Sequence, residues 1–256
     1  MKTWMVETQA LKKYYRLGEN TVKALDGVDL TVERGEFVAM IGKSGSGKST
    51  LLNCIATIDT PTAGHIRVEG QDVTALKGRS LSRFRRERLG FVFQDCNLLD
   101  TLTAFENIAL ALTIRGTPAG EIEGRVKETA ELLGITDCLN KYPYQMSGGQ
   151  RQRTAAARAI ITDPALVLAD EPTGALDSRS AKLLLDRFEA LNREGRATIL
   201  MVTHDAFTAS YCRRILFLQD GAVLTQLERG GQSRRAFFQQ IIGVVTRLGG
   251  DQSDVL

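Results

Sequence analysis

Residues 42–49 bring together three glycines, two lysines and three serines in the order Gly-Lys-Ser-Gly-Ser-Gly-Lys-Ser. The segment fits the pattern G-x-x-x-x-G-K-[ST] at every fixed position. Glycines let the backbone turn its N–H groups toward phosphate oxygens, and a helix starting near Lys48 adds its positive end. Lys48 supplies a cation for the outer phosphates, and the Ser49 hydroxyl can ligate magnesium. A flexible glycine-serine turn is the alternative, but the buried strand expected before the loop and the helix after it favour phosphate binding.

The residues expected to bind nucleotide on this loop are Gly42, Lys43, Ser44, Gly45, Ser46, Gly47, Lys48, Ser49 and Thr50.

Two adjacent carboxylates follow a second apolar run. Residues 166–169 are Leu-Val-Leu-Ala, and Asp170, Glu171 and Pro172 come next. Phosphoryl transfer needs a carboxylate for magnesium and a group that positions the attacking water. Successive strand side chains point to opposite faces, so both carboxylates can serve one site only if the strand stops there, and Pro172 favours that stop. We expect Asp170 to bind the metal and Glu171 to act as the general base; a solvated strand end is the alternative.

Two further polar residues end apolar runs. Gln94 follows Phe-Val-Phe, and its amide could reach the magnesium ion or the water. His204 follows the run 199–203, and a ring nitrogen there could hydrogen-bond the outermost phosphate. Neither residue type identifies such a site by itself.

Strand patterns and helix patterns alternate along the chain, which predicts an α/β protein with a parallel-sheet core. The segment up to about residue 70 is β-rich, residues from about 95 to 162 are mainly helical, and strands return afterwards. The expected strands are 28–32, 37–41, 89–93, 165–169, 197–203 and 214–218. The expected helices are 103–115, 120–134, 150–161, 178–192 and 206–212.

Composition narrows the class of protein. The 256-residue chain has a formal net charge of only +3, which does not indicate a nucleic-acid binder. Its four cysteines form no CxxC pair, so we expect reduced thiols rather than a zinc site or disulfides. The longest apolar stretches fall far short of the ~20 residues of a membrane helix, and no signal peptide is visible in residues 1–16.

A further motif gives the sequence a family resemblance. Residues 146–150, Met-Ser-Gly-Gly-Gln, resemble the LSGGQ signature of ABC ATPases, with Met in place of Leu. Ser147 is a good N-cap for the helix that follows, which would make an anion-binding helix end. Residues 174–177 resemble the D-loop of that family, Gln94 its Q-loop and His204 its H-loop. Tyr15 falls where the adenine-stacking aromatic usually lies, with Tyr14 as the neighbouring candidate.

This resemblance, over roughly residues 6–225, implies a P-loop NTPase (RecA-like) core with an N-terminal antiparallel β subdomain and an α-helical insert. It implies an ABC ATPase domain at 1–225, with the helical subdomain at about 95–162, and a C-terminal helical extension at 226–256. It further implies ATP and Mg²⁺ as cofactors, with Ser49, Gln94 and Asp170 on the metal and Glu171 and His204 in catalysis. Two copies would sandwich two ATP molecules, because the signature of one copy contacts nucleotide held by the other. The residues that would act in trans are Ser147, Gly148, Gly149, Gln150 and Asp177.

Within the family, residues 15–19, 41–52, 90–94 and 170–177 resemble the macrolide-export and lipoprotein-release type. The tail, residues 237–242 through 248–251, resembles ATPases of bacitracin-resistance transporters for antimicrobial peptides. That resemblance implies a separate membrane permease, a location at the cytoplasmic face of the cell membrane and, in some systems, a membrane sensor kinase. A lipoprotein-release or macrolide-export ATPase and a non-transport ABC ATPase remain alternatives. The cargo and the direction of transport are not encoded in this chain.

Two surface features have more than one reading. The arginines at 79, 83, 85, 86 and 88 could contact nucleic acid, but a solvated helix face or a contact to anionic groups near the membrane fits them better. The tail from 234 to 248 carries an apolar helical stripe, which could bind a membrane or a partner helix. Packing against its own domain or its dimer mate is the simpler expectation.

Overall fold

The computed structural model describes residues 4–18, 20–195 and 197–249, which form two compact units. The first unit contains the residues up to Thr74 together with those from Met201 onward, and the second contains Ala75–Leu200. Strand β8 (Thr198–Val202) crosses from the second unit to the first between Leu200 and Met201. The last residues of the tail, 250–256, lie outside the described part of the chain.

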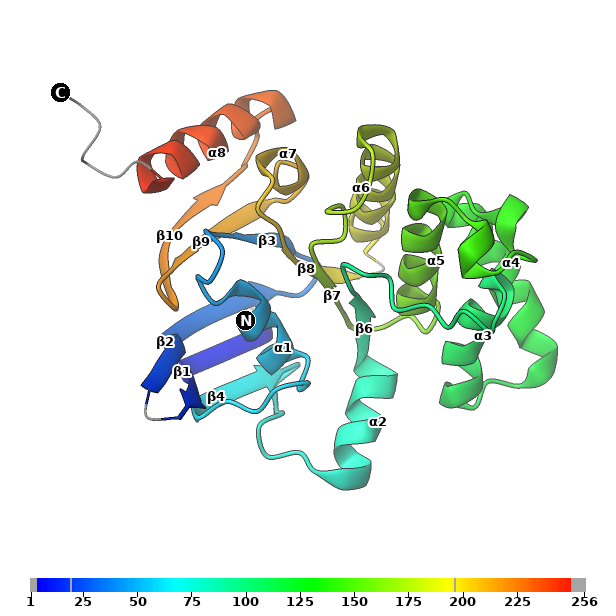
Figure 1. Ribbon diagram of the computed structural model, residues 1–256, viewed down its shortest axis with the longest axis horizontal. Coiled ribbons are helices and arrows are strands. Elements are labelled where there is room, and N and C mark those ends of the chain that lie inside the picture. Colours follow the sequence, from blue (N-terminus) through cyan, green and yellow to red (C-terminus); the bar gives the residue numbers. More distant parts are fainter. Residues whose placement is uncertain (1–3, 19, 196, 250–256) are drawn as a thin grey trace. The chain divides into compact units, whose positions relative to one another are not determined.

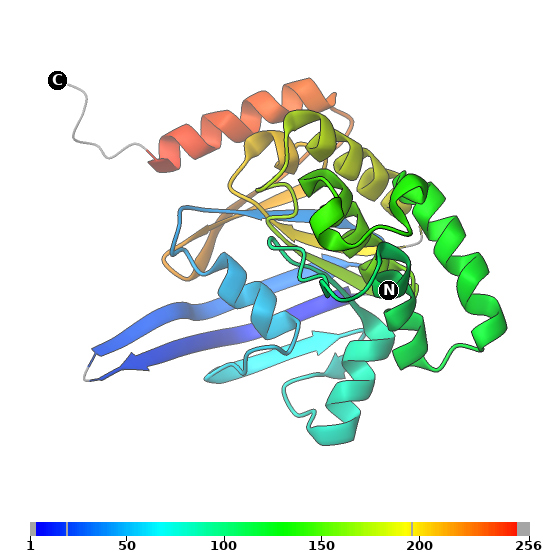
Figure 2. The same cartoon turned by 45° about the vertical axis from the view of Figure 1, so that its right-hand side comes forward.

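The first unit holds an antiparallel sheet with the strand order β2-β1-β4-β5. Its strands are β1 (Trp4–Leu17), β2 (Asn20–Glu33), β4 (Ala63–Val68) and β5 (Gln71–Asp72). Figure 2 shows β1 and β2 side by side along most of their length. Val28, Leu30 and Val32 are buried at alternate positions of β2, as their period of two predicts. The antiparallel β subdomain expected near the N-terminus is therefore present.

A second group of strands in this unit includes the phosphate-loop strand. Strand β3 (Phe37–Ile41) is buried at every position and pairs in parallel with β9 (Arg214–Gln219), which pairs antiparallel with β10 (Ala222–Glu228). A strand buried on both faces reads as a continuous apolar run, as seen for β3. Helix α1 (Lys48–Ile55) follows β3 after a short loop.

Helix α8 (Arg234–Gly249) is the extension expected from the apolar stripe of the tail, and it packs on the first unit (Figure 1). Phe237, Ile241 and Val244 are buried, and the Arg234 guanidinium lies 4.2 Å from the ring centroid of Tyr211. Tyr211 comes just after α7 (Ala206–Ala209), so the tail helix covers the short helix at the end of β8. The buried apolar face of α8 therefore packs on its own domain, as expected from the sequence.

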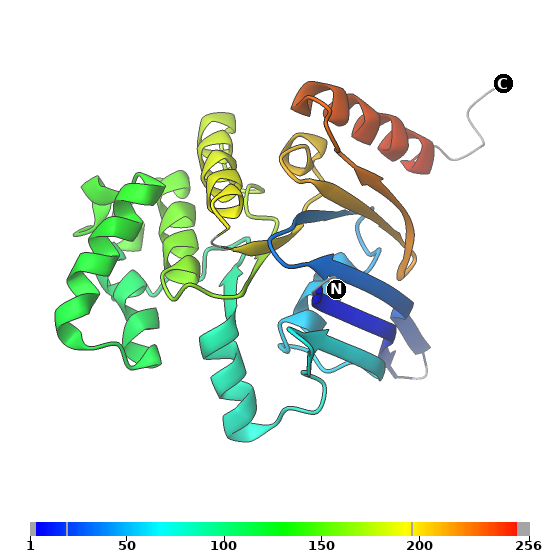
Figure 3. The same cartoon turned by 180° about the vertical axis from the view of Figure 1, so that it is seen from behind.

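The second unit combines strands β6 and β7 with most of the helices (Figure 3). Strands β6 (Leu89–Val92) and β7 (Leu166–Asp170) pair in parallel, with Gly90 opposite Val167. The helices of this unit are α2 (Gly78–Arg88), α3 (Ala104–Arg115), α4 (Ala119–Leu133), α5 (Gly148–Ile160) and α6 (Ser178–Arg193), with short 3₁₀ turns at Thr136–Cys138 and Pro143–Gln145. The helices expected at 103–115, 120–134, 150–161 and 178–192 correspond to α3, α4, α5 and α6.

The structure changes one expected helix end and shows where the basic run and the cysteines lie. Helix α7 ends at Ala209 rather than 212, where the Ser210 hydroxyl donates to the Phe207 carbonyl at 2.6 Å. The basic run forms α2, whose one buried residue is Phe84, so its arginines lie on an exposed face. All four cysteines are free thiols. No helix among the described residues is long and apolar enough to span a membrane.

Candidate nucleotide-binding and catalytic site

The loop between β3 and α1 has the backbone geometry that its glycines were expected to allow. Gly47, the residue before α1, has a φ of 96°, and a Cβ there would lie 2.3 Å from the Ala24 carbonyl oxygen of β2. A Cβ on Gly42 would lie 2.3 Å from the carbonyl oxygen of Leu218 on β9. The carbonyl oxygens of Ala24 on β2 and Leu218 on β9 therefore leave no room for a side chain at either glycine.

Lys48 places a positive charge inside this loop. Its ammonium donates hydrogen bonds of 2.8 Å to the carbonyl oxygens of Gly42 and Lys43, and only 7% of the residue is exposed. A buried ammonium that is held by neutral carbonyl groups makes the loop attractive to anions. Ser49 and Thr50 follow on the first turn of α1, whose N-terminal end adds to this attraction.

The two candidate aromatic residues have different surroundings. The Tyr15 phenol donates to Asp59 at 2.5 Å and also hydrogen-bonds with Thr50 on α1. The Tyr14 phenol donates to Asp26 on β2 at 2.5 Å. Of the two rings, Tyr15 is therefore the one held against the helix that follows the phosphate loop.

His204 lies in the same unit as the phosphate loop. It directly follows Thr203, whose N–H donates to the Met40 carbonyl of β3 at 3.1 Å, two residues before the loop begins. The His204 side chain is exposed, and Asp205 caps α7 by accepting from the N–H groups of Phe207 and Thr208. The histidine is thus at the edge of the sheet at which β3 delivers Gly42.

In the second unit, the strand that carries the two carboxylates ends where the proline predicted. Strand β7 is buried as far as Ala169 and ends at Asp170, and Glu171 has a φ of 44°. The left-handed conformation costs a non-glycine residue on the order of 1–2 kcal/mol, and it breaks the alternation of strand side chains. A Cβ on Gly174 would lie 3.5 Å from Glu171 Oε2 and 3.4 Å from Gln94 Nε2. The side chains of Glu171 and Gln94 therefore converge beside Gly174.

The signature segment forms a capped helix N-terminus. The Ser147 hydroxyl accepts from the N–H of Gln150, and the Gln150 side chain accepts from the N–H of Ser147 at 3.0 Å. This capping box accounts for Ser147 and Gln150 structurally. A Cβ on Gly149 would lie 2.4 Å from Ser180 Oγ, whereas one on Gly148 would have ordinary contacts, the nearest atom being 3.6 Å away. Packing therefore explains the glycine at 149, whereas position 148 has room for a side chain.

Asp177 belongs to the same corner of the second unit. Its carboxylate caps α6 by accepting from the N–H groups of Arg179 and Ser180 at 3.0 Å. These backbone and side-chain hydrogen bonds from Ser180, with that from the Arg179 N–H, lower the pKa of Asp177. Because Gly149 packs against Ser180, the signature and Asp177 lie close together although about thirty residues separate them in sequence.

The expected magnesium ligands fit the metal by donor chemistry. Ser49 offers a hydroxyl, Gln94 an amide oxygen and Asp170 a carboxylate, and hard oxygen donors are those that Mg²⁺ prefers. Ser49 belongs to the first unit, and Gln94 and Asp170 belong to the second. Within the described residues, no group of three or more His, Cys, Asp or Glu side chains forms a metal cluster of its own.

The sequence reasoning missed Lys13 and Asp59, which hold Tyr15. Lys13 and Tyr15 are close in sequence, but Asp59 lies 44 residues from Tyr15 and reaches it only in the folded sheet. The only sequence signal was the Lys-Tyr-Tyr order, and it does not identify an acidic partner.

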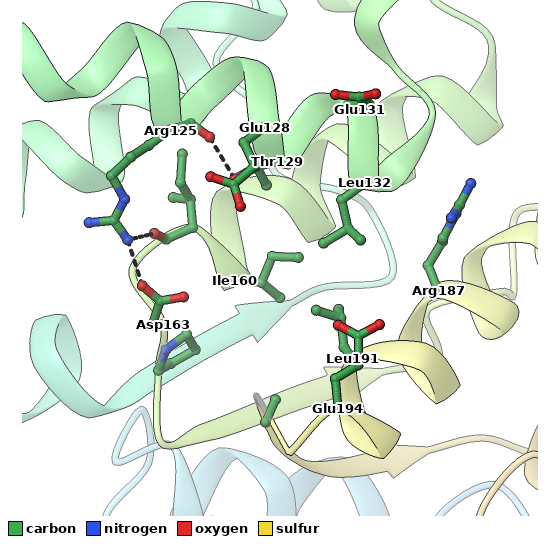
Figure 4. A pocket seen from close by; sticks show the side chains of 13 residues that line it. Arg125, Glu128, Thr129, Glu131, Leu132, Ile160, Asp163, Arg187, Leu191 and Glu194 are labelled. Atoms are coloured by element: carbon green, nitrogen blue, oxygen red, sulfur yellow. Dashed lines mark hydrogen bonds and ion pairs between the residues drawn. The ribbon is translucent and has the colours of Figure 1, made fainter.

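A separate cleft of about 830 Å³ lies in the second unit, and its lining residues come from α4, the end of α5 and α6 (Figure 4). Arg125 bridges the Asp163 carboxylate and the Ile161 carbonyl oxygen at 2.6 Å each, and Leu132, Ile160 and Leu191 give the cleft apolar walls. None of the expected site residues lines it.

The fold and the glycine-rich loop define a P-loop nucleotide-binding protein with an α/β core. Residues 25–174 match the ABC transporter family, and the chain belongs to that family. It is an ATP-binding subunit of the ABC transporter type and an ATPase.

Several relatives are similar over nearly the whole chain. The bacitracin export ATP-binding protein BceA of Halalkalibacterium halodurans is 48% identical over 98% of this chain and 99% of its own length. The ABC transporter ATP-binding protein YxdL of Bacillus subtilis is 47% identical over 98% of this chain and 97% of its own. The macrolide export ATP-binding/permease protein MacB of Syntrophobacter fumaroxidans is 44% identical over 86% of this chain, but that match covers only 31% of MacB.

Solved structures support the fold independently. A dimeric structure of the ABC transporter cassette MJ0796 matches with a TM-score of 0.84 and 38% identity, covering 89% of this chain and all of that one. A post-hydrolysis structure of the same cassette, bound to ADP and phosphate, matches with a TM-score of 0.83. The expected P-loop NTPase fold of the ABC ATPase type is confirmed.

Proposed function

We propose that this subunit powers a transporter by closing, with ATP, on a second copy of itself, and that a separate membrane permease carries the cargo. The observation that supports this best is the N-terminus of α5 at Gly148, which has room for a side chain and lies near Asp177. A helix end of this kind attracts phosphate. The phosphate loop already supplies such an end within the first unit, so the second end is suited to nucleotide held by another copy.

In the proposed reaction, each residue has one task. Lys48 and the loop N–H groups hold the phosphates, and His204 donates a hydrogen bond to the outermost phosphate. Mg²⁺, when bound by Ser49, Gln94 and Asp170, neutralises the charge on the phosphate oxygens. Glu171 accepts a proton from the attacking water, whose oxygen bonds to the γ-phosphorus as the bond to the ADP oxygen breaks.

For the cargo, we propose peptide antibiotics or related substrates extracted from the membrane. This rests on the similarity to the bacitracin export protein along the full chain, including the tail that forms α8. The MacB relatives support macrolide export as the second candidate, and lipoprotein release belongs to the same type. The matches to transporter proteins speak against a non-transport ABC ATPase. We propose no nucleic-acid partner for the exposed arginines of α2. A sensor kinase as a further partner stays a prediction.

We place the chain at the cytoplasmic face of the cell membrane, where it is bound through the permease. This placement rests on the proposed permease, to which the subunit would attach. The proposed domain division keeps the ABC ATPase domain at 1–225, its helical subdomain at about 95–162 and the extension at 226–256.

The first experiment is size-exclusion chromatography of Glu171→Gln with and without ATP. Removing the base leaves binding intact but blocks hydrolysis, so we expect a shift from monomer to dimer only when ATP is present. Lys48→Ala is the control, and it should remain a monomer because it no longer binds ATP. If Glu171→Gln binds ATP in a direct assay but stays monomeric at every protein concentration, closure by ATP alone is wrong.

A further inference from the structure

We propose that Lys13 and Asp59 are positioning residues for ATP binding because they fix the ring of Tyr15 as the platform for the base. This inference rests on the proposed role of Tyr15 in binding nucleotide. It goes beyond that role by naming the side chains that hold the platform and by predicting what they change.

The Asp59 carboxylate connects the other two side chains. Its Oδ2 accepts the Tyr15 hydroxyl at 2.5 Å, and its Oδ1 accepts the Lys13 ammonium at 2.5 Å. The ammonium also donates to the Thr60 carbonyl at 2.8 Å and lies 4.9 Å from the centroid of the Tyr15 ring. The ring is therefore held at its hydroxyl and contacted by a cation over one face, which fixes its plane.

Partial burial makes this cluster stronger than an ordinary surface ion pair. The side chains of Lys13 and Asp59 are only 13% and 27% exposed, so solvent screens their attraction less than it screens exposed pairs. Tyr15 keeps 36% of its surface exposed. The polar end of the tyrosine is thus anchored while part of the ring remains available for stacking.

The protonation states that the cluster needs are stable at neutral pH. Burial, together with the hydrogen bond to Asp59, raises the pKa of Tyr15 to about 12, so the phenol stays protonated and donates. Burial alone would raise the pKa of Asp59, but the hydrogen bonds from Lys13 and Tyr15 outweigh it and hold the pKa below its usual value. Burial also raises the pKa of the Cys54 thiol on α1 to about 12.

The cluster also ties the platform to the phosphate loop. Asp59 follows the C-terminal end of α1, and the N–H groups of Ile58 and Asp59 both donate to the Asn53 carbonyl. The same helix begins with Lys48 and contacts the Tyr15 phenol through Thr50. The base platform is therefore held at a set position relative to the phosphate loop, as a ligand with a base and phosphates at fixed spacing requires.

The neighbouring tyrosine provides a matched control. Tyr14 donates to Asp26 at 2.5 Å, Lys23 pairs with Asp26 at 3.2 Å, and the Lys23 ammonium lies 5.4 Å from the Tyr14 ring centroid. This second cluster has the same three residue types but is anchored on β2 rather than next to α1. Replacing its carboxylate changes the same chemistry without touching the Tyr15 ring.

The experiment measures the affinity of the full chain for Mg²⁺-ATP and for inorganic triphosphate, which lacks the base. The variants are Asp59→Asn, Tyr15→Phe, their combination, Asp59→Glu and the control Asp26→Asn. We expect Asp59→Asn to lower the affinity for ATP about three- to tenfold, which is the effect that loss of one hydrogen bond usually has. The affinity for triphosphate should not change. The KM for ATP should rise with kcat preserved at saturation, and Asp59→Glu should recover part of the loss.

Tyr15→Phe removes only the hydrogen bond to Asp59, whereas Asp59→Asn also removes the ion pair with Lys13. Tyr15→Phe should therefore weaken ATP binding no more than Asp59→Asn does, and the combination should bind ATP no more weakly than Asp59→Asn alone. Equal loss of ATP and triphosphate affinity in Asp59→Asn would overturn the proposal, since it would show a general effect on the phosphate loop. An equal ATP defect in Asp26→Asn would overturn it as well. Tyr15→Ala tests the proposed nucleotide role of Tyr15 separately from the positioning role of Lys13 and Asp59. If Tyr15→Ala binds ATP normally while Lys48→Ala does not, the Tyr15 ring does not support the base, and the proposed nucleotide role of Tyr15 is itself wrong.

Discussion

Left-handed backbone conformations occur both in the phosphate loop and directly after β7. Gly45 and Gly47 have φ values of 80° and 96°, and Glu171 adopts 44° without being glycine. A glycine adopts a positive φ at little energetic cost. A residue with a side chain incurs a steric penalty there, which the surrounding structure must offset. The phosphate loop adopts this conformation with glycines, whereas Glu171 adopts it while carrying a side chain.

Gly47→Ala tests this distinction between strain and space. A Cβ at Gly47 meets the Ala24 carbonyl oxygen at 2.3 Å, whereas one at Gly45 meets nothing within 4 Å. We expect Gly45→Ala to cost on the order of 1–2 kcal/mol, the left-handed penalty alone. Gly47→Ala should cost clearly more, because β2 or α1 must move. Urea unfolding measures both, and equal losses would contradict the role of the Ala24 contact.

At the scale of elements, helix ends determine where the polar groups meet. The start of α5 packs on the start of α6 through Gly149 and Ser180, which brings Ser147 and Asp177 into one corner. In the first unit, the hydrogen bond from Thr203 to Met40 brings the end of β8 to β3, and with it His204. Short contacts of this kind bring together residues that are far apart in sequence.

Helix α8 gives the prediction at this scale. Phe237 is fully buried, while Ile242 on the same helix is 38% exposed. We expect Phe237→Ala to lower the free energy of unfolding by about 3–5 kcal/mol through the cavity it leaves. Ile242→Ala should change it by less than about 0.5 kcal/mol. If chemical denaturation shows similar effects for both, α8 does not pack on its own unit as described.

At the scale of the whole molecule, the proposed catalytic residues divide between the two units. Lys48, Ser49, Tyr15 and His204 belong to the first, and Gln94, Asp170, Glu171 and the signature belong to the second. In the proposed mechanism, the signature serves the nucleotide of another copy. One chain would then contribute to two sites, and a two-fold dimer would complete both.

Mixing two inactive variants tests this arrangement. Lys48→Ala removes the phosphate-loop cation, and Ser147→Arg blocks the signature. In a mixed dimer, one site has both defects and the other has neither. We expect ATP hydrolysis to recover to at most about a quarter of the wild-type rate, since half of the dimers would be mixed with one intact site each. No recovery, with mixed dimers shown to form, would mean that the sites are not shared or that both must work together.

Several features could be predicted from the sequence because they depend on local chemistry. The glycines of the phosphate loop, the apolar runs of β3 and β7, and the Ser147 cap each depend on neighbours within a few residues. The stop of β7 was predictable from Pro172, although the left-handed backbone of Glu171 was not. The family resemblance favoured Tyr15 over the neighbouring Tyr14, but no local pattern distinguishes two adjacent tyrosines of one strand.

The sequence by itself determined the phosphate loop, the family resemblance and the strand ends that carry Asp170, Glu171 and His204. Only the tertiary structure decided that Tyr15 is held by Asp59 and Lys13, that Gly149 meets Ser180, and that the tail helix buries Phe237. The physical reason is the range of the interactions. Turns, caps and apolar periodicity are properties of neighbouring residues, whereas an ion pair or a packing contact exists only after the intervening chain has folded.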